Sequence, residues 1–134
     1  MTEQRVARKL LELDFRTLVV QLILDGKAEE ALQLLAKHYS VNLPKIKVGL
    51  PRRHRRNTLG CYMTKNETIS VLDSDTLKEP SVILHEFYHH LRSSPEGKKH
   101  KGTERHANRF AKKFIDTYKV AMIKTGENTC FSND

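Results

Sequence analysis

Residues 85–90, with the sequence HEFYHH, carry the spacing that points most directly to chemistry. Two histidines four residues apart lie one turn apart on a helix, so both imidazoles can reach one zinc ion at about 2.0–2.1 Å. A glutamate directly after the first histidine stands beside that ion and can take a proton from a water molecule there. The segment therefore predicts that His85 and His89 are metal ligands and that Glu86 is a catalytic base. The alternative is a surface helix on which the histidines stand by chance.

A helix over residues 80–92 would separate a chemical face from an apolar one. Pro80 suits the first turn of a helix, where its missing N–H is not needed. At about 100° per residue, His89 lies about 40° from His85 and Glu86 about 100° from it. The opposite arc holds the apolar side chains, which are Ile83, Leu84, Phe87, Tyr88 and Leu91. Because chance histidines would not predict this division, we favour the metal site.

A catalytic zinc ion also needs a third protein ligand and a position that stays open for water. On a final helix predicted over residues 103–124, Glu104 points along the core-facing stripe, where a carboxylate requires a nearby cation. We therefore expect Glu104 to be the third ligand, against the alternative of a solvated glutamate favoured by the helix dipole. Asn108 follows one turn later on the same face, placed to hydrogen-bond a ligand histidine or to orient the carboxylate.

Three other histidines compete for the third position, and each is expected at the surface. His90 should lie at the edge of its helix, pointing away from His85 and His89. His100 falls in a polar loop, and His106 falls on the exposed side of the last helix.

The remaining elements must hold these two helices together. Apolar residues at helical spacing predict helices over residues 3–24 and 28–39, with Asp25 as a cap of the second helix. Residues 45–50 alternate as a strand does. Residues 59–64 and 68–72 predict a hairpin whose turn contains the sequence KNE.

This order of elements, helices and then a small sheet and then helices, predicts an α+β fold. The length of 134 residues suits a single domain over residues 1–134. Within it we expect N-terminal helices over residues 1–40 and a small, antiparallel-edged sheet with the metal-binding helices over residues 44–124. A polar tail follows over residues 125–134.

The set His85, Glu86, His89, Glu104 and Asn108 resembles the gluzincin clan of zinc peptidases, in which a glutamate on a following helix is the third ligand. The sequence ERHANRFA is similar to the E-x-x-A-N-x-F-A segment of ImmA/IrrE-type proteases, and the small size is similar to that of minigluzincins, some of which are latent. The resemblance spans about residues 44–118. It implies a zincin-like fold, one Zn²⁺ per chain and a polypeptide substrate.

Within that resemblance, we expect a zinc-dependent endopeptidase whose strand over residues 58–63 pairs with an extended peptide. Phe87 departs from the pattern, because a small residue usually follows the glutamate of the motif. The likeness is therefore specific for zinc peptidase chemistry and weak for the substrate.

A second hypothesis comes from the net charge of +8, which favours acidic partners such as nucleic acid. The densest basic run supplies a candidate contact patch of Arg52, Arg53, Arg55 and Arg56, without an aromatic residue for base stacking. The corresponding function is a DNA-associated regulatory or binding protein. It would be either a SprT-like protease acting on DNA–protein crosslinks or a zinc-stabilised nucleic-acid-binding module. A SprT-like protein would require histidine as the third ligand, so Glu104 argues against that version.

The remaining features bear on location and regulation. No apolar run is long enough to span a bilayer, and the first residues lack the pattern of a secretory signal, so we expect a cytoplasmic protein without a membrane partner. Cys61 and Cys130 form no metal motif. A tail that carries Cys130 and Asp134 is long enough to return to the cleft and occupy the open zinc position, which would make the enzyme latent. The alternative, which we favour, is a disordered polar end such as chain termini usually have.

Overall fold

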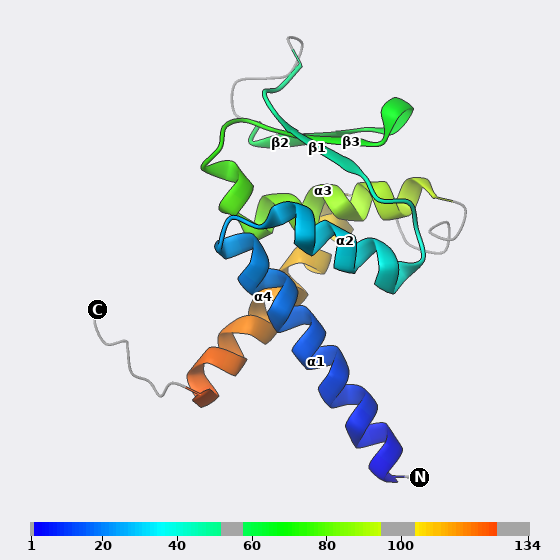
Figure 1. Cartoon of the computed structure of the whole chain (residues 1–134), viewed down its shortest axis with the longest axis vertical. Coiled ribbons are helices and arrows are strands. Elements are labelled where there is room, and N and C mark those ends of the chain that lie inside the picture. Colours follow the sequence, from blue (N-terminus) through cyan, green and yellow to red (C-terminus); the bar gives the residue numbers. More distant parts are fainter. Residues whose placement is uncertain (1, 52–57, 95–103, 126–134) are drawn as a thin grey trace.

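The computed structural model describes residues 2–51, 58–94 and 104–125, with side chains from residue 13 to residue 123 of these ranges (Figure 1). This part of the chain has the α+β composition that the sequence predicts. Its four α-helices are α1 (Thr2–Leu24), α2 (Ala28–Tyr39), α3 (Pro80–Ser93) and α4 (Glu104–Thr125). Its three strands are β1 (Lys45–Val48), β2 (Gly60–Met63) and β3 (Thr68–Val71).

The sheet has the order β1-β3-β2, so β2 is an edge strand. β3 pairs with β1 in parallel and with β2 antiparallel, which confirms the predicted hairpin and its antiparallel edge. The hairpin turn is a short 3₁₀ helix, Thr64–Asn66, followed by Glu67 in a left-handed conformation with φ 51°.

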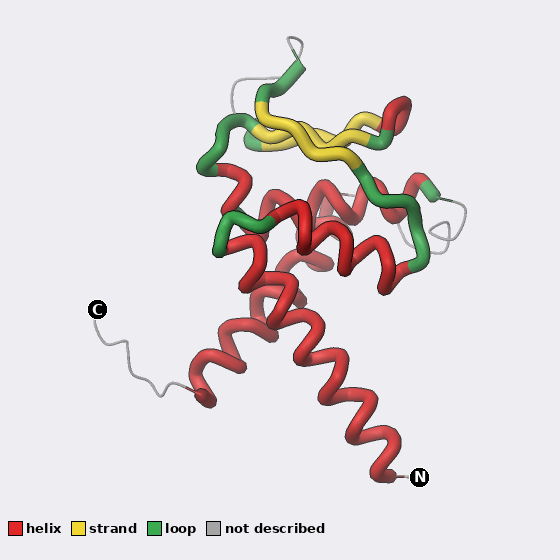
Figure 2. The backbone as a smooth tube through the Cα atoms, in the orientation of Figure 1, coloured by secondary structure: helices red, strands yellow, loops and turns green. Residues whose placement is uncertain are grey.

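The helices lie on one side of the sheet, with α3 next to the strands and with α1 and α4 crossing beneath it (Figure 2). α3 contacts β2, β3 and α4, so it is the helix around which the domain is built. The predicted apolar arc of α3 is buried in the core: Ile83, Leu84, Phe87, Tyr88 and Leu91 each keep 5% exposure or less. The opposite arc of α3 is thereby turned toward β2 and the first turn of α4.

The predicted helix cap at Asp25 is wrong. α2 begins after Lys27, which makes no side-chain capping bond, and Asp25 instead accepts a hydrogen bond from Gln21 of α1 at 2.9 Å. Gly26, with φ 82°, provides the left-handed residue that reverses the chain immediately after α1. Asp25 therefore belongs to the end of the first helix and lies two residues before the N-cap position of the second.

Candidate metal centre

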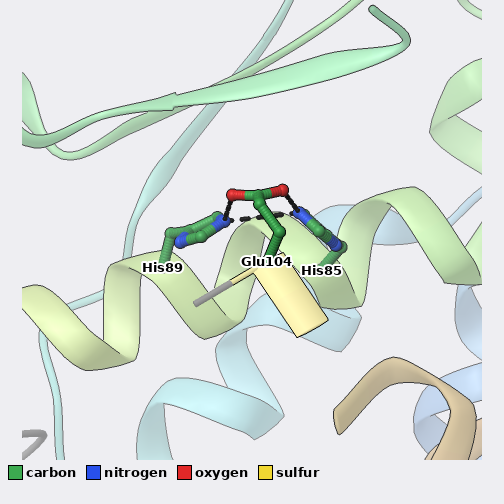
Figure 3. Close-up of side chains that lie close together, drawn as sticks. All are labelled: His85, His89 and Glu104. Atoms are coloured by element: carbon green, nitrogen blue, oxygen red, sulfur yellow. Dashed lines mark hydrogen bonds and ion pairs between the residues drawn. The ribbon is translucent and has the colours of Figure 1, made fainter. Parts of the chain in front are cut away.

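The structure brings His85, His89 and Glu104 together from two helices (Figure 3). Nε2 of His85 lies 2.8 Å from one carboxylate oxygen of Glu104, and Nε2 of His89 lies 2.9 Å from the other. The two Nε2 atoms are 3.3 Å apart. Three ligand atoms, one from each residue, therefore share a space less than 4.8 Å across, which suits a metal ion.

The tautomer of the His85 ring determines which nitrogen faces Glu104, and this tautomer favours a cation between the two side chains. Nδ1 of His85 donates to the side-chain oxygen of Asn108 at 2.7 Å, because an amide oxygen can only accept. In the neutral imidazole, Nε2 then presents its lone pair to the Glu104 carboxylate. An acceptor facing an acceptor is unfavourable unless a proton or a metal ion lies between them.

At His89, the surroundings favour a metal ion over a proton on the ring. Burial lowers the pKa of His89, although the Glu104 carboxylate acts in the opposite direction and His85 lowers it further. A lowered pKa favours the neutral imidazole, which is the form that binds metals. Four ligands at about 2.0–2.1 Å in a tetrahedron are separated by about 3.3–3.4 Å, and the two Nε2 atoms already have that separation. The donor set and its spacing thus fit zinc.

Glu86 lies beside this cluster but on the inner side of α3, with 7% of its surface exposed. Its burial raises the pKa to about 7; the charge of Glu104 also raises it, while His85 acts in the opposite direction. A carboxylate with a pKa near neutral is well matched to taking and returning a proton. A bound cation would lower this pKa and favour the ionised base.

Glu104 differs from the expectation that it lies along a buried stripe. Its side chain is 75% exposed, although it does face the two histidines. The reason is its place at the first residue of α4, because the buried stripe of that helix begins at Ala107, one turn later. The carboxylate therefore leaves one side of the cluster open to solvent.

His90 also differs from the expectation, because it is buried with 1% exposure and is not a surface residue. Its Nε2 donates to the carbonyl oxygen of Asn42 at 2.6 Å, and its Nδ1 then accepts from the hydroxyl of Tyr62 at 2.8 Å. Both ring nitrogens are satisfied, so His90 fastens α3 to the edge strand and to the segment after α2. It has no free nitrogen for a metal ion.

A cleft of about 570 Å³ opens above the cluster, between α3, the first residue of α4 and the edge strand β2. Its lining comprises Thr58, Gly60, Cys61, Tyr62, Thr64, His85, Glu86, His89, Arg92, Ser93 and Glu104. Sequence reasoning missed Tyr62 and Arg92 as cleft residues. Arg92 carried a usable signal, because it lies seven residues after His85 and so returns to the same helix face after two turns.

Close approach of β2 to the base depends on Gly60. A Cβ atom at this position would lie 2.8 Å from Cγ1 of Val82 and 3.4 Å from Cγ of Glu86. Any larger residue would push the strand away from α3. The glycine therefore lets the edge strand run directly over Glu86.

Of the other predicted residues, only His106 and Cys61 lie in the described part of the chain, and neither belongs to the cluster. His106 lines a separate pocket together with Tyr88 and Phe110. The arginine patch at residues 52–57, His100 and the tail residues Cys130 and Asp134 lie outside the described residues. Cys61 is buried, and this burial raises the pKa of its thiol above the usual range.

In the described part of the chain, no helix combines the length and the apolar character needed to cross a membrane. Comparisons with protein-family models, with curated proteins and with solved structures find no match to this chain. What the protein does is therefore inferred from its own residues.

Proposed function

We propose that the chain is a zinc-dependent endopeptidase of the gluzincin type, built on a zincin-like domain. The observation that carries this proposal is the convergence of His85, His89 and Glu104 beside a buried glutamate, within an open cleft bordered by an edge strand. One zinc ion per chain would be held by these three residues. Asn108 fixes His85 in the tautomer that points Nε2 at the ion.

Each residue of the site has a distinct task in the proposed reaction. When bound, zinc would acidify a water molecule and polarise the scissile carbonyl group. Glu86 accepts the proton of the attacking water and returns it to the nitrogen of the leaving amine.

The edge strand β2 offers a means of binding an extended polypeptide. Among the described strands it pairs with β3 alone, so its other side can receive a substrate strand. Gly60, Cys61 and Tyr62 of this strand line the cleft that contains Glu86 and the metal ligands. A peptide added there would pass its backbone over the base.

The exposure of the cluster favours a catalytic over a purely structural zinc ion. Structural zinc sites are usually closed by four protein ligands, whereas catalytic sites keep one position open. Among the described residues, the cluster has three ligands, and the carboxylate of Glu104 is 75% exposed. The nucleic-acid hypothesis and the cytoplasmic location gain no support from this site and stay predictions.

The proposal is tested by measuring zinc and peptide cleavage on the same protein. We expect about one zinc per chain by elemental analysis, and cleavage of unstructured peptides that stops when a chelator removes the metal. Glu86→Gln should keep the zinc and lose at least about a hundredfold in kcat. Glu104→Ala and His85→Ala should each lose the zinc.

Three results would contradict the proposal. The first is full zinc content in Glu104→Ala, which would place the third ligand elsewhere. The second is a zinc-loaded protein that cleaves no peptide of a broad mixture. The third is a Glu86→Gln variant as active as the wild type.

A further inference from the structure

Arg92 is a charged residue of the cleft for which the proposed reaction has no use. It lies on α3 seven residues after His85, and it lines the same cleft as His85 and Glu104. Seven residues turn a helix by about 700°, so Arg92 lies only about 20° from the direction of His85. Among the described residues that line the cleft, it is the one lysine or arginine.

One nitrogen of the Arg92 guanidinium group lacks a hydrogen-bond partner within the described part of the protein. Its Nε is buried and has no hydrogen-bond partner there. The two carboxylates of the same cleft have other roles, since Glu104 pairs with both histidines and Glu86 is the base. Arg92 as a whole is half-buried and lines the cleft, so the part of its guanidinium group that faces the cleft can form charge-assisted hydrogen bonds with a carboxylate of a ligand.

The relative direction of β2 and α3 shows which part of a substrate would reach Arg92. Gly60 lies against Glu86, and the Tyr62 hydroxyl lies 2.8 Å from His90 and 3.3 Å from Ser93. The strand advances about 6.6 Å over two residues and the helix about 6 Å over four, so the two elements run in step and in the same direction. Arg92 is therefore at the Tyr62 end of the edge strand.

A substrate strand that pairs antiparallel with β2 would run from the Tyr62 end toward the Gly60 end. Its residues before the cleaved bond would then lie at the Arg92 end of the cleft. Arg92 is three residues beyond His89, or about 4.5 Å along the helix axis. That distance places its side chain about one to three residues before the cleaved bond of an extended peptide.

We propose that Arg92 binds a carboxylate side chain of the substrate, an aspartate or glutamate on the N-terminal side of the cleaved bond. The proposal rests on the proposed peptidase function and names its substrate class. A free C-terminal carboxylate offers the same chemistry, but it would reach Arg92 only in a peptide that pairs parallel with β2.

The test uses the zinc-loaded full chain and a mixture of peptides with Glu, Gln or Lys at each position, with free and with amidated C-termini. Mass spectrometry of the products locates each cleaved bond, and kcat/KM is measured for the matched peptides. We expect at least about a tenfold preference for Glu over Gln before the cleaved bond, equal for both kinds of C-terminus. Arg92→Gln should abolish the preference, and Arg92→Glu should turn it toward Lys.

Arg109→Gln is the matched control, because it removes an exposed arginine of α4 that lines a different pocket. It should leave the Glu-to-Gln ratio unchanged. Circular dichroism and zinc content establish that each variant is folded. If Arg92→Glu does not fold, the test rests on Arg92→Gln alone. An unchanged ratio in Arg92→Gln, an equal loss of kcat on all peptides, or a preference that requires a free C-terminus would each overturn the proposal.

A binding measurement separates this inference from the peptidase function. Fluorescence anisotropy of labelled Glu and Gln peptides on the zinc-loaded Glu86→Gln protein reports recognition without cleavage. One outcome is that the wild type cleaves no peptide, while Glu peptides still bind about tenfold more tightly than Gln peptides in a way that depends on Arg92. In that case the carboxylate site stands and the peptidase function fails. If peptides are cleaved but neither binding nor cleavage depends on Arg92, the function stands and the carboxylate site fails.

Discussion

Glu86 combines two requirements that oppose each other. As a base it must lie against the metal cluster and away from bulk water, and only 7% of its surface is exposed. The same burial raises its pKa to about 7, so the ionised form is disfavoured in the folded, metal-free protein. Between its usual pKa of about 4.5 and this raised pKa, Glu86 is protonated in the folded protein and ionised in the unfolded chain. The contribution of Glu86 to the stability of the metal-free protein therefore falls as the pH rises from about 4.5 to about 7.

Removing this charge should stabilise the metal-free protein at alkaline pH. Without metal, we expect Glu86→Gln to raise the free energy of unfolding at pH 8 by about 1–3 kcal/mol, and by much less at pH 4.5. Urea unfolding across this pH range in the presence of a chelator measures the difference. Asp14→Asn, which removes an exposed carboxylate of α1, is the control. A difference that does not grow with pH would mean that Glu86 is not destabilised by its charge.

At the scale of elements, the site depends on how closely β2 approaches α3. His90 ties the two together through Tyr62, and Gly60 removes the side chain that would keep them apart. Because the elements run in step, the cleft that holds the base also borders a strand edge. The strand and the helix thus form one unit, in which a larger side chain at position 60 would shift the surroundings of Glu86.

Gly60→Ala should therefore disturb both stability and catalysis. The added methyl group would meet Val82 at 2.8 Å, and we expect a loss of about 1–3 kcal/mol in the free energy of unfolding. Peptide cleavage should fall while zinc content stays the same. The double variant Gly60→Ala/Val82→Ala removes the clashing atom, so its loss should be smaller than the sum of the two single losses. Strictly additive losses would show that Val82 does not limit the approach.

At the scale of the whole molecule, the metal ligands join α3 to α4, two helices that are 10 residues apart along the chain, from Ser93 to Glu104. These helices also pack against each other in the core, and α1 crosses α4 and packs against it (Figure 1). A metal ion bound by both helices adds a link that the unfolded chain cannot make. Zinc binding should therefore be coupled to the stability of the entire domain.

Zinc should raise the thermal unfolding temperature, and the rise should require the ligand from α4. At a free zinc concentration of about a thousand times Kd, the added stability is about 4 kcal/mol. We expect Glu104→Ala to lose this stabilisation and Glu86→Gln to keep it, as measured by calorimetry with and without chelator. A zinc-dependent rise of equal size in Glu104→Ala would show that α4 does not take part in binding.

The sequence by itself determined the features that depend on local periodicity. The two faces of α3, the hairpin and the spacing of His85 and His89 follow from helix and strand geometry, which relates each residue to neighbours a few positions away. Helical periodicity also selected Glu104, by its expected place on the core-facing stripe of the last helix, and Asn108, by its place one turn later. It would also have placed Arg92 on the face of His85.

Only the tertiary structure decided what lies opposite each face. The burial of His90 depends on Asn42 and Tyr62, which are 48 and 28 residues away. The exposure of Glu104 depends on where α4 begins to pack, a property that a helical wheel does not contain. Burial and pairing across the fold arise from contacts between segments that are distant in the sequence. A periodic pattern predicts the face on which a residue lies, but it does not predict which segment packs against that face.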